Sequence, residues 1–319
     1  RGVSVNTIKA YKDTFVLFLR FMQSVMGMNA NSLMLRDITQ EVIIHFLDWL
    51  ETERGCGIST RNARLATLHS FFNYLQYRSP ILLHEWQRIL AIPMKKSEKP
   101  IRTHICMEGV KLLLEQPERS TPMGLRDLAI LSLFYDSGAR VQELIDLTPA
   151  DMNLNKPYSL RIRGKGNKKR LVPLMDGQVA VLVEYMKGNR LMDPSAASSP
   201  LFSNSRMDHF TRMGINNILQ KYVKLVKFDN PNLLPDKITP HVLRHSKAMH
   251  LLQAGVNIVY IRDFLGHSSI ATTEVYARAD TKLKREALER AYDLIPDKKT
   301  EKAIWLNDAG IMDWLKQIT

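Results

Sequence analysis

The feature that most constrains the fold of this chain is a break in its hydrophobic periodicity between residues 93 and 103. The segment reads Pro-Met-Lys-Lys-Ser-Glu-Lys-Pro-Ile-Arg-Thr, with two prolines, several charges and no apolar repeat. Such a composition is typical of an extended linker. In a chain of 319 residues both flanking parts are long enough to bury a core. We therefore predict domains at residues 1–92 and 104–297, a linker at 93–103 and a tail at 298–319.

The first domain contains four stretches with the 3.6-residue apolar spacing of amphipathic helices. In residues 4–26 the apolar face consists of Ile8, Tyr11, Phe15, Phe18, Leu19 and Met22. Further helices are predicted from Thr39 to Gly55, from Ser59 through Leu75, and around Trp86–Leu90. Four helices of this kind predict a small bundle.

The second domain combines helices with one short hairpin. Thr121 and Pro122 predict the start of a helix that is apolar on nearly all sides and ends at Ser137-Gly138, so we expect it to be the buried core helix. Strands are predicted at residues 158–163 and 170–174, and further helices at 176–190 and 211–227. The predicted fold class is mainly α with a small β-hairpin: a four-helix domain followed by an α+β domain.

A block of polar residues between Thr239 and Tyr276 has the character of an anion-binding site. Thr239 and Pro240 predict a helix start, which places His241 and Arg244 three residues apart on one face near the positive end of the helix dipole. Free backbone N–H groups, a guanidinium and an imidazole at such an end suit a phosphate. Tyr276, farther along in polar surroundings, is a candidate nucleophile.

The charge balance indicates a polyanionic partner. A net charge of +13 and a pI near 9.7, spread along the chain, favour nucleic acid over a membrane surface, although an ordinary basic protein stays an alternative. The two cysteines, Cys56 and Cys106, support no disulfide framework and predict an intracellular protein. The sequence has no long apolar run, no phosphate-binding GxxxxGK[ST] loop and no paired acidic metal site.

Three motifs of the second domain together resemble the tyrosine recombinases, the phage-integrase and Xer-like family. The first is Gly138-Ala139-Arg140-Val141-Gln142-Glu143-Leu144, and the second is the hairpin turn Gly164-Lys165-Gly166-Asn167-Lys168. The third is His241-x-x-Arg244, then Leu265-Gly266-His267, with Tyr276 nine residues after the last histidine. The resemblance implies an N-terminal core-binding domain and a catalytic domain that close round a DNA duplex.

The resemblance and the residue types together predict metal-free and ATP-free cleavage of a DNA phosphodiester. Arg140 and Arg244 would bind the non-bridging oxygens, and Tyr276 would attack to give a 3′-phosphotyrosyl link. His241 suits a base, and His267 suits a hydrogen bond to the phosphate or the positioning of Tyr276. The resemblance makes Lys165 the general acid for the 5′ oxygen. The predicted catalytic set is Arg140, Lys165, His241, Arg244, His267 and Tyr276, with no cofactor and no metal.

Other polar residues have weaker predicted roles. Glu143, three residues after Arg140, either holds the arginine side chain or is an ordinary surface carboxylate. Contacts to DNA phosphates are predicted for two groups, in the third helix and after the hairpin turn, with solvation as the alternative. These groups are Arg61, Asn62 and Arg64, and Lys168, Lys169 and Arg170.

The resemblance also implies partners. It predicts double-stranded DNA with inverted-repeat-like core sites, a dimer on each site and a tetramer in synapsis, in the cytoplasm and nucleoid of a bacterium. The apolar residues of the tail, such as Trp305 and Trp314, predict docking on a neighbouring protomer or on the same domain. Accessory proteins and target sequence are not predicted.

Alternative functions remain open at this stage. The leading prediction is the recombinase of a mobile element (integrase or transposase) or of a chromosome-dimer resolution system. A type IB topoisomerase uses the same residue types, and a non-cutting DNA-binding protein can share the fold. Zinc binding by the histidines at positions 241, 245, 250 and 267 is disfavoured, because no HExxH glutamate or nearby cysteine accompanies them.

Overall fold

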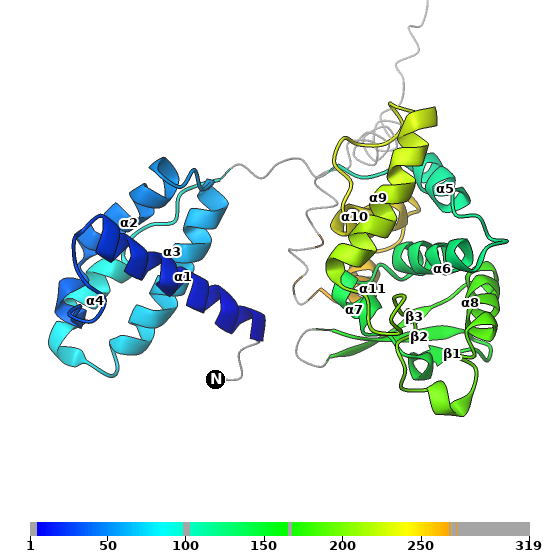
Figure 1. Ribbon diagram of the computed structural model, residues 1–319, viewed down its shortest axis with the longest axis horizontal. Helices are drawn as coiled ribbons and strands as arrows, with labels where there is room; N and C mark the ends of the chain where they lie inside the picture. Colours follow the sequence, from blue (N-terminus) through cyan, green and yellow to red (C-terminus); the bar gives the residue numbers. More distant parts are fainter. Residues whose placement is uncertain (1–4, 98–102, 165–167, 268, 270–272, 274–319) are drawn as a thin grey trace, which may run out of the picture. The chain divides into compact units, whose positions relative to one another are not determined.

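The computed structural model describes residues 5–97, 103–164, 168–267, 269 and 273 (Figure 1). The chain separates into two compact units, residues 1–100 and 101–319, and each is described by itself. No helix of the described residues is long and apolar enough to cross a membrane. The linker prediction coincides with residues 93–97 and 103, which have neither helix nor strand, and its central part lies outside the described residues.

The first unit is a four-helix bundle. Its helices are α1 (Val5–Ser24), α2 (Gln40–Thr52), α3 (Ile58–Leu75) and α4 (Leu83–Leu90), with short 3-10 turns at Leu35–Asp37 and Pro80–Leu82. Helix α3 packs against the other three helices. The core between them is aromatic, with Phe21, Phe46, Phe72 and Trp86 fully buried. The predicted bundle is therefore confirmed.

Two local predictions in this unit need correction. Helix α3 begins at Ile58, and its N-cap is the extended backbone of Gly57 without a side-chain hydrogen bond, so Ser59 does not open the helix. The apolar face of α1 is only partly buried: Phe18 and Met22 lie in the core, whereas Ile8 is exposed. Helical spacing alone thus overestimates how much of α1 the bundle covers.

The second unit is a helical domain with a small sheet. Its helices are α5 (Met107–Glu115), α6 (Pro122–Ser137), α7 (Val141–Ile145), α8 (Asp176–Gly188), α9 (Arg212–Asp229), α10 (Pro240–Gln253) and α11 (Ile258–Leu265). Its strands are β1 (Met152–Asn153), β2 (Ser159–Arg163) and β3 (Lys169–Pro173), and 3-10 turns occupy Pro149–Asp151 and Pro194–Ala196. The predicted mainly α class with a small sheet is confirmed.

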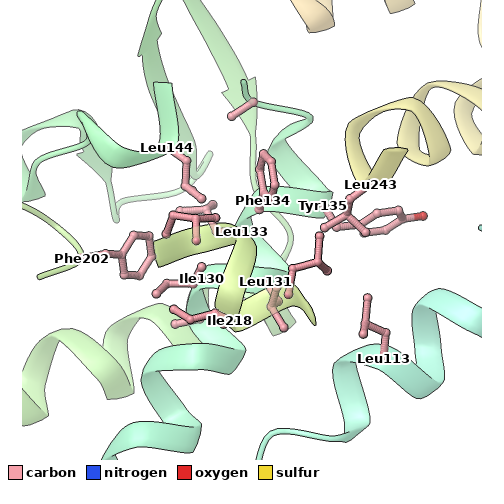
Figure 2. Packing of buried hydrophobic residues seen from close by; sticks show 14 of the residues in the cluster. Leu113, Ile130, Leu131, Leu133, Phe134, Tyr135, Leu144, Phe202, Ile218 and Leu243 are labelled. Carbon is pink, nitrogen blue, oxygen red and sulfur yellow. The ribbon is translucent and has the colours of Figure 1, made fainter. Parts of the chain in front are cut away.

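Helix α6 is the buried centre of this unit, as its sequence predicts. The Thr121 hydroxyl caps its start by accepting a hydrogen bond from the Gly124 N–H at 3.0 Å, and Gly138 ends it in the left-handed conformation with φ 53°. The helix lies between α8 on one side and α10 on the other (Figure 1). Figure 2 shows its apolar side chains among those of neighbouring elements, including Ile130, Leu131, Leu133, Phe134, Leu113, Phe202, Ile218 and Leu243.

The sheet is antiparallel, with the order β1-β2-β3. In the β2–β3 hairpin, Leu160 pairs with Val172 and Ile162 pairs with Arg170. Leu160, Ile162 and Val172 are buried, which gives the alternation expected of a strand with one covered face. Strand β3 ends at Pro173, one residue before the predicted end, and the turn residues 165–167 lie outside the described residues.

Several elements were not predicted from the sequence, among them α5, α7, α11 and β1. Helix α5 begins after Cys106, whose Sγ accepts a hydrogen bond from the Gly109 N–H at 3.4 Å. Cysteine is not among the usual N-cap residues, so the sequence carries no start signal for this helix. Strand β1 is only two residues long and forms because β2 pairs with it.

Candidate active site

The start of α10 follows the sequence prediction. Thr239 is the N-cap, its hydroxyl accepts a hydrogen bond from the Val242 N–H at 3.4 Å, and Pro240 is the first helical residue. His241 is exposed at this end of the helix, whereas Arg244, one turn later, is buried. The two side chains predicted to share a phosphate therefore differ in their access to solvent.

Arg140 stands at the junction between α6 and α7. The left-handed turn at Gly138 ends α6, and Arg140 is the N-cap residue of α7. Glu143 closes this cap: its Oε2 accepts the Arg140 backbone N–H at 2.8 Å, and its Oε1 accepts a hydrogen bond from Nη1 of the same arginine at 2.6 Å. Both the backbone and the guanidinium of Arg140 are thus held by one carboxylate.

Glu143 also contacts two other arginines. Its Oε2 accepts a hydrogen bond from Nη2 of Arg170 at 2.7 Å and lies 3.8 Å from Nη1 of Arg244. The exposed side-chain fractions are 6% for Glu143, 3% for Arg244, 10% for Arg170 and 42% for Arg140. Of the two interpretations of Glu143, the structure favours the one in which it holds Arg140, since the carboxylate is buried.

The protonation state of Glu143 follows from these contacts. Burial on its own raises the pKa of this carboxyl, but hydrogen bonds from Arg170 and from the Arg140 backbone outweigh it and hold the pKa below its ordinary value. Glu143 is therefore a carboxylate at neutral pH. Three arginines against one carboxylate leave this cluster with an excess of positive charge.

The same three arginines bind the C-terminal end of α11. Three consecutive carbonyl oxygens each accept a hydrogen bond from a different arginine: Phe264 from Arg170 Nε at 2.9 Å, Leu265 from Arg244 Nη2 at 2.6 Å, and Gly266 from Arg140 Nη2 at 3.2 Å. The last carbonyls of a helix lack partners within it and form the negative end of its dipole. We call Glu143, Arg140, Arg170 and Arg244 the arginine cluster.

His267 follows this helix end directly. Its backbone N–H donates to the Arg262 carbonyl at 3.0 Å, and its Nδ1 lies 2.9 Å from the Thr273 hydroxyl oxygen. Burial and the positive charges of Arg244, Arg140 and Arg170 lower the pKa of His267 to about 4. The imidazole is therefore neutral at neutral pH, with one ring N–H to donate.

A basic cavity of about 510 Å³ opens beside the cluster. Its lining consists of Arg140, Gly164, Lys168, Lys169, Arg170, Arg262, Asp263, Gly266 and His267. A cavity with this many cations and one neutral imidazole can bind a phosphate diester and neutralise its non-bridging oxygens. Among the side chains the structure describes, no group of three or more His, Cys, Asp or Glu residues is arranged to hold a metal ion.

The predicted catalytic residues divide into three groups. Arg140 and Arg244 both contact Glu143 and the end of α11, and His267 follows that helix end directly. His241 lies one helical turn before Arg244, and its protonated form contributes to lowering the pKa of His267. Lys165 and Tyr276 lie outside the described residues, so their roles stay predictions.

The three residues after the hairpin turn that were predicted to contact DNA differ in their exposure. Lys168 and Lys169 are exposed and line the basic cavity, which is compatible with phosphate contact. Arg170 differs from its sequence interpretation, because its guanidinium points inward to Glu143 and Phe264 and is nearly covered. A basic residue after a turn gives no sign in the sequence that its partners are buried.

In the first unit the three predicted DNA contacts also have internal partners. Arg61 is buried, lies 3.8 Å from Glu51 and donates to the Pro93 carbonyl at 3.4 Å. Asn62 accepts the Lys95 backbone N–H at 3.1 Å and donates to the Lys95 carbonyl at 2.8 Å. Arg64 donates to the Thr14 hydroxyl at 3.0 Å. These side chains fasten residues 93–95 and α1 to α3, and DNA contact at them stays a prediction.

Two site features were missed by the sequence analysis. Arg262, one turn before the end of α11, lines the cavity, and Thr273 contacts His267. His245 and His250, for which zinc binding was disfavoured, are buried, and His250 Nδ1 lies 2.7 Å from the Tyr135 hydroxyl. No spacing signal marks Arg262, since a basic residue in the last turn of a helix is common on any surface.

Comparisons with known proteins agree with this architecture. The model of the phage integrase family matches residues 105–282, and that of the phage integrase N-terminal SAM-like domain matches residues 1–79. Tyrosine recombinase XerC of Pelotomaculum thermopropionicum is 32% identical over 297 residues, covering 92% of each chain. Tyrosine recombinase XerD of Listeria monocytogenes serotype 4b is 34% identical over 289 residues, covering 89% of this chain and 91% of the relative.

Solved structures share the fold at lower identity. The XerH site-specific recombinase bound to a palindromic difH substrate, in a post-cleavage complex, has a TM-score of 0.70 at 22% identity and covers 90% of this chain and 80% of its own. The Tn1549 transposon integrase in complex with transposon right-end DNA has a TM-score of 0.69 at 17% identity, with 91% and 94% covered. With both domain models and full-length relatives matched, this chain belongs to the phage integrase family of tyrosine recombinases.

Proposed function

We propose that this protein is a site-specific DNA recombinase that cuts and rejoins DNA strands through a 3′-phosphotyrosyl intermediate, using neither metal nor ATP. The observation that carries the proposal is the convergence of Arg140 and Arg244 on Glu143 and on the end of α11, which His267 follows directly, beside a basic cavity. The type IB topoisomerase alternative is not favoured, because the relatives matched over most of their length are named recombinases.

In the proposed reaction the two arginines bind the non-bridging oxygens of the scissile phosphate. Arg140 has the access for this, whereas the Arg244 side chain is only 3% exposed. A phosphate bound at Arg140 therefore reaches Arg244 only after a local opening around the latter. Guanidinium groups suit the role because they bind two oxygens of one phosphate and keep their charge at any physiological pH.

The histidines and the nucleophile complete the reaction. The Tyr276 oxygen attacks phosphorus and its proton passes to His241, while the bond to the 5′ oxygen breaks and that oxygen takes a proton from Lys165. His267 donates a hydrogen bond to the phosphate, since its ring is neutral and its Nδ1 faces the Thr273 hydroxyl. This leaves Nε2 as the nitrogen that carries the proton when the hydroxyl donates to Nδ1.

The partners proposed for this function are DNA and further copies of the chain. Two relatives of the same fold were solved with DNA, the XerH recombinase and the Tn1549 integrase, which supports duplex DNA as the ligand here. We further propose inverted-repeat-like sites, a dimer on each site and a tetramer in synapsis. The proposed docking of the tail on a neighbouring protomer concerns residues outside the described part.

The experiment is covalent trapping on nicked DNA. A duplex that binds the protein is first selected from a random-sequence pool, and nicks are then placed along it so that the cut strand diffuses away. The wild-type chain should form an adduct that resists denaturing gel electrophoresis. Tyr276→Phe should bind the same duplex with unchanged affinity and form no adduct, because the phenol oxygen is the attacking atom.

Tyr260→Phe is the matched control. Tyr260 lies exposed on α11 and takes no part in the proposed reaction, so this variant should form the adduct at the wild-type rate. An adduct formed by Tyr276→Phe, or no adduct from the wild-type chain on any selected duplex, would refute the proposed mechanism.

A further inference from the structure

Arg170 is the one arginine of the arginine cluster without a part in the proposed reaction. It lies on β3 directly after Lys169, but the two side chains point to different surroundings: Lys169 is exposed, whereas the Arg170 side chain is 10% exposed. Two of its donors, Nε and Nη2, are already bonded inside the protein, so we consider what these contacts do.

Those contacts join two parts of the site that are distant in sequence. Arg170 Nε donates to the Phe264 carbonyl of α11 at 2.9 Å, and Nη2 donates to Glu143 Oε2 of α7 at 2.7 Å. The planar guanidinium presents both N–H groups at fixed directions, so one side chain sets the distance between the carboxylate and the helix end. A lysine ammonium has the same charge but lacks this planar fork of N–H donors.

The guanidinium also packs on the backbone that leads to His267. Gly266 has φ 65°, and a methyl group added to it would lie 2.9 Å from Arg170 Nη1. Glycine at this position thus serves two purposes, the left-handed end of α11 and the close approach of Arg170. Because His267 is the next residue, the place of its imidazole depends on where Arg170 holds this turn.

We propose that Arg170 is a positioning residue that fixes Glu143 relative to the last turn of α11, so that Arg140 and His267 are in place before DNA binds. The inference rests on the proposed recombinase function, because the step it affects is strand cleavage. Arg170 acts through both neighbours: through Glu143 on the guanidinium of Arg140, and through Phe264 and Gly266 on His267.

Arg170→Lys is the test, because it keeps the charge and removes the fork. The probe is the nicked duplex selected with the wild-type chain. The equilibrium affinity for this duplex should stay within about 2-fold, while the single-turnover rate of adduct formation should fall roughly 10- to 100-fold, the range typical of residues that orient a catalytic group. Loss of stability alone would not separate binding from cleavage in this way.

Arg161→Lys is the matched control. Arg161 lies on β2 of the same sheet and likewise binds a buried carboxylate and a backbone carbonyl, with Nε 3.2 Å from Asp151 and Nη2 2.9 Å from the Ala150 carbonyl oxygen. Within the part of the chain that the structure describes, the Arg161 side chain forms no hydrogen bond or ion pair with the arginine cluster, so the rate of adduct formation should stay within about 2-fold of wild type.

The outcomes are distinct. If the wild-type chain forms the adduct and Arg170→Lys forms it at the same rate, this inference is overturned and the proposed function stands. If the wild-type chain forms no adduct, both are overturned. An equal fall of affinity and rate, or an equal fall of the rate in Arg161→Lys, also overturns it. Should Arg170→Lys not fold, Arg170→Gln replaces it with the same expectation; failure of both to fold assigns Arg170 to stability and counts against the inference.

Discussion

Replacing Glu143 by glutamine tests whether one carboxylate holds the arginine cluster together. The change keeps the shape of the side chain and removes its charge, which leaves Arg170 and Arg244 buried without a counter-charge on Glu143. Removing one partner of a buried ion pair costs about 3–5 kcal/mol. Because Arg140 is 42% exposed, solvent screens its share, and we expect a loss of roughly 3 kcal/mol from the free energy of unfolding of the second unit.

The effect should depend on pH in one direction. The folded-state pKa of Glu143 lies below its value in the unfolded chain, which is about 4.3. The carboxylate therefore contributes its stabilisation fully above that pH, and the contribution is lost as the pH falls through the folded value. The difference between wild type and Glu143→Gln should be constant from neutral pH down to about pH 5 and should shrink below about pH 4.

Calorimetry with hydrogen exchange measures this prediction. A loss of roughly 3 kcal/mol corresponds to about 6–12 °C in the melting temperature of a unit of this size. Exchange resolved by segment should place the change in the second unit and leave α1–α4 unaffected. Glu115→Gln is the control, because Glu115 is an exposed carboxylate 3.9 Å from Lys111, and its loss should change stability by less than about 0.5 kcal/mol.

Two results would refute the reasoning. One is a Glu143→Gln variant whose melting temperature at neutral pH equals that of Glu115→Gln. The other is a difference from wild type that persists unchanged at pH 3, because a contribution from a lowered carboxyl pKa must shrink once the pH falls below the unfolded-state value.

Two further predictions concern the end of α11. Gly266→Ala should destabilise the protein more than Gly255→Ala in chemical denaturation. Both glycines have a positive φ, which alone costs an alanine about 1 kcal/mol, but nothing lies within 4 Å of a methyl group added at position 255. Equal losses of stability in the two variants would contradict the contact between Gly266 and Arg170. The ring signals of His267 should titrate near pH 4 in NMR. The stability that its neutral ring contributes is therefore present above about pH 6.5 and is lost as the pH falls toward 4. A titration midpoint above about pH 6 would contradict the lowered pKa.

The parts of the fold that could be predicted are those with local signals. The bounds of α6 follow from Thr121-Pro122 at its start and Gly138 at its end, and the start of α10 follows from Thr239. Helix α5 has an unusual cap, Cys106, and strand β1 exists only through its pairing with β2, so neither shows in a window of sequence. Local rules find an element when the usual cap residues mark its ends, and miss it when the cap is unusual or when the element depends on a distant partner.

The same distinction applies to the site. Arg140 and Glu143 are three residues apart in sequence, and their pairing was one of the two interpretations of Glu143 that the sequence left open. The partners of Arg170 and Arg244 on α11 and at Gly138 are 94 and 106 residues away, and no periodicity connects them. Arg170 was interpreted as a phosphate contact because a basic residue after a basic turn gives the same pattern whether it points outward or inward.

The arginine cluster resolves an electrostatic conflict at this site. The carbonyl end of α11, beside the basic cavity, carries the negative end of a helix dipole, which disfavours a bound phosphate. Three arginines cover its last carbonyls, so the helix end that would repel the anion instead orders the guanidinium groups that attract it. Glu143 limits the mutual repulsion of these guanidinium groups without cancelling their charge. A phosphate-binding surface can therefore be built on a helix C-terminus, provided that its cations are ordered by the carbonyls before the anion arrives.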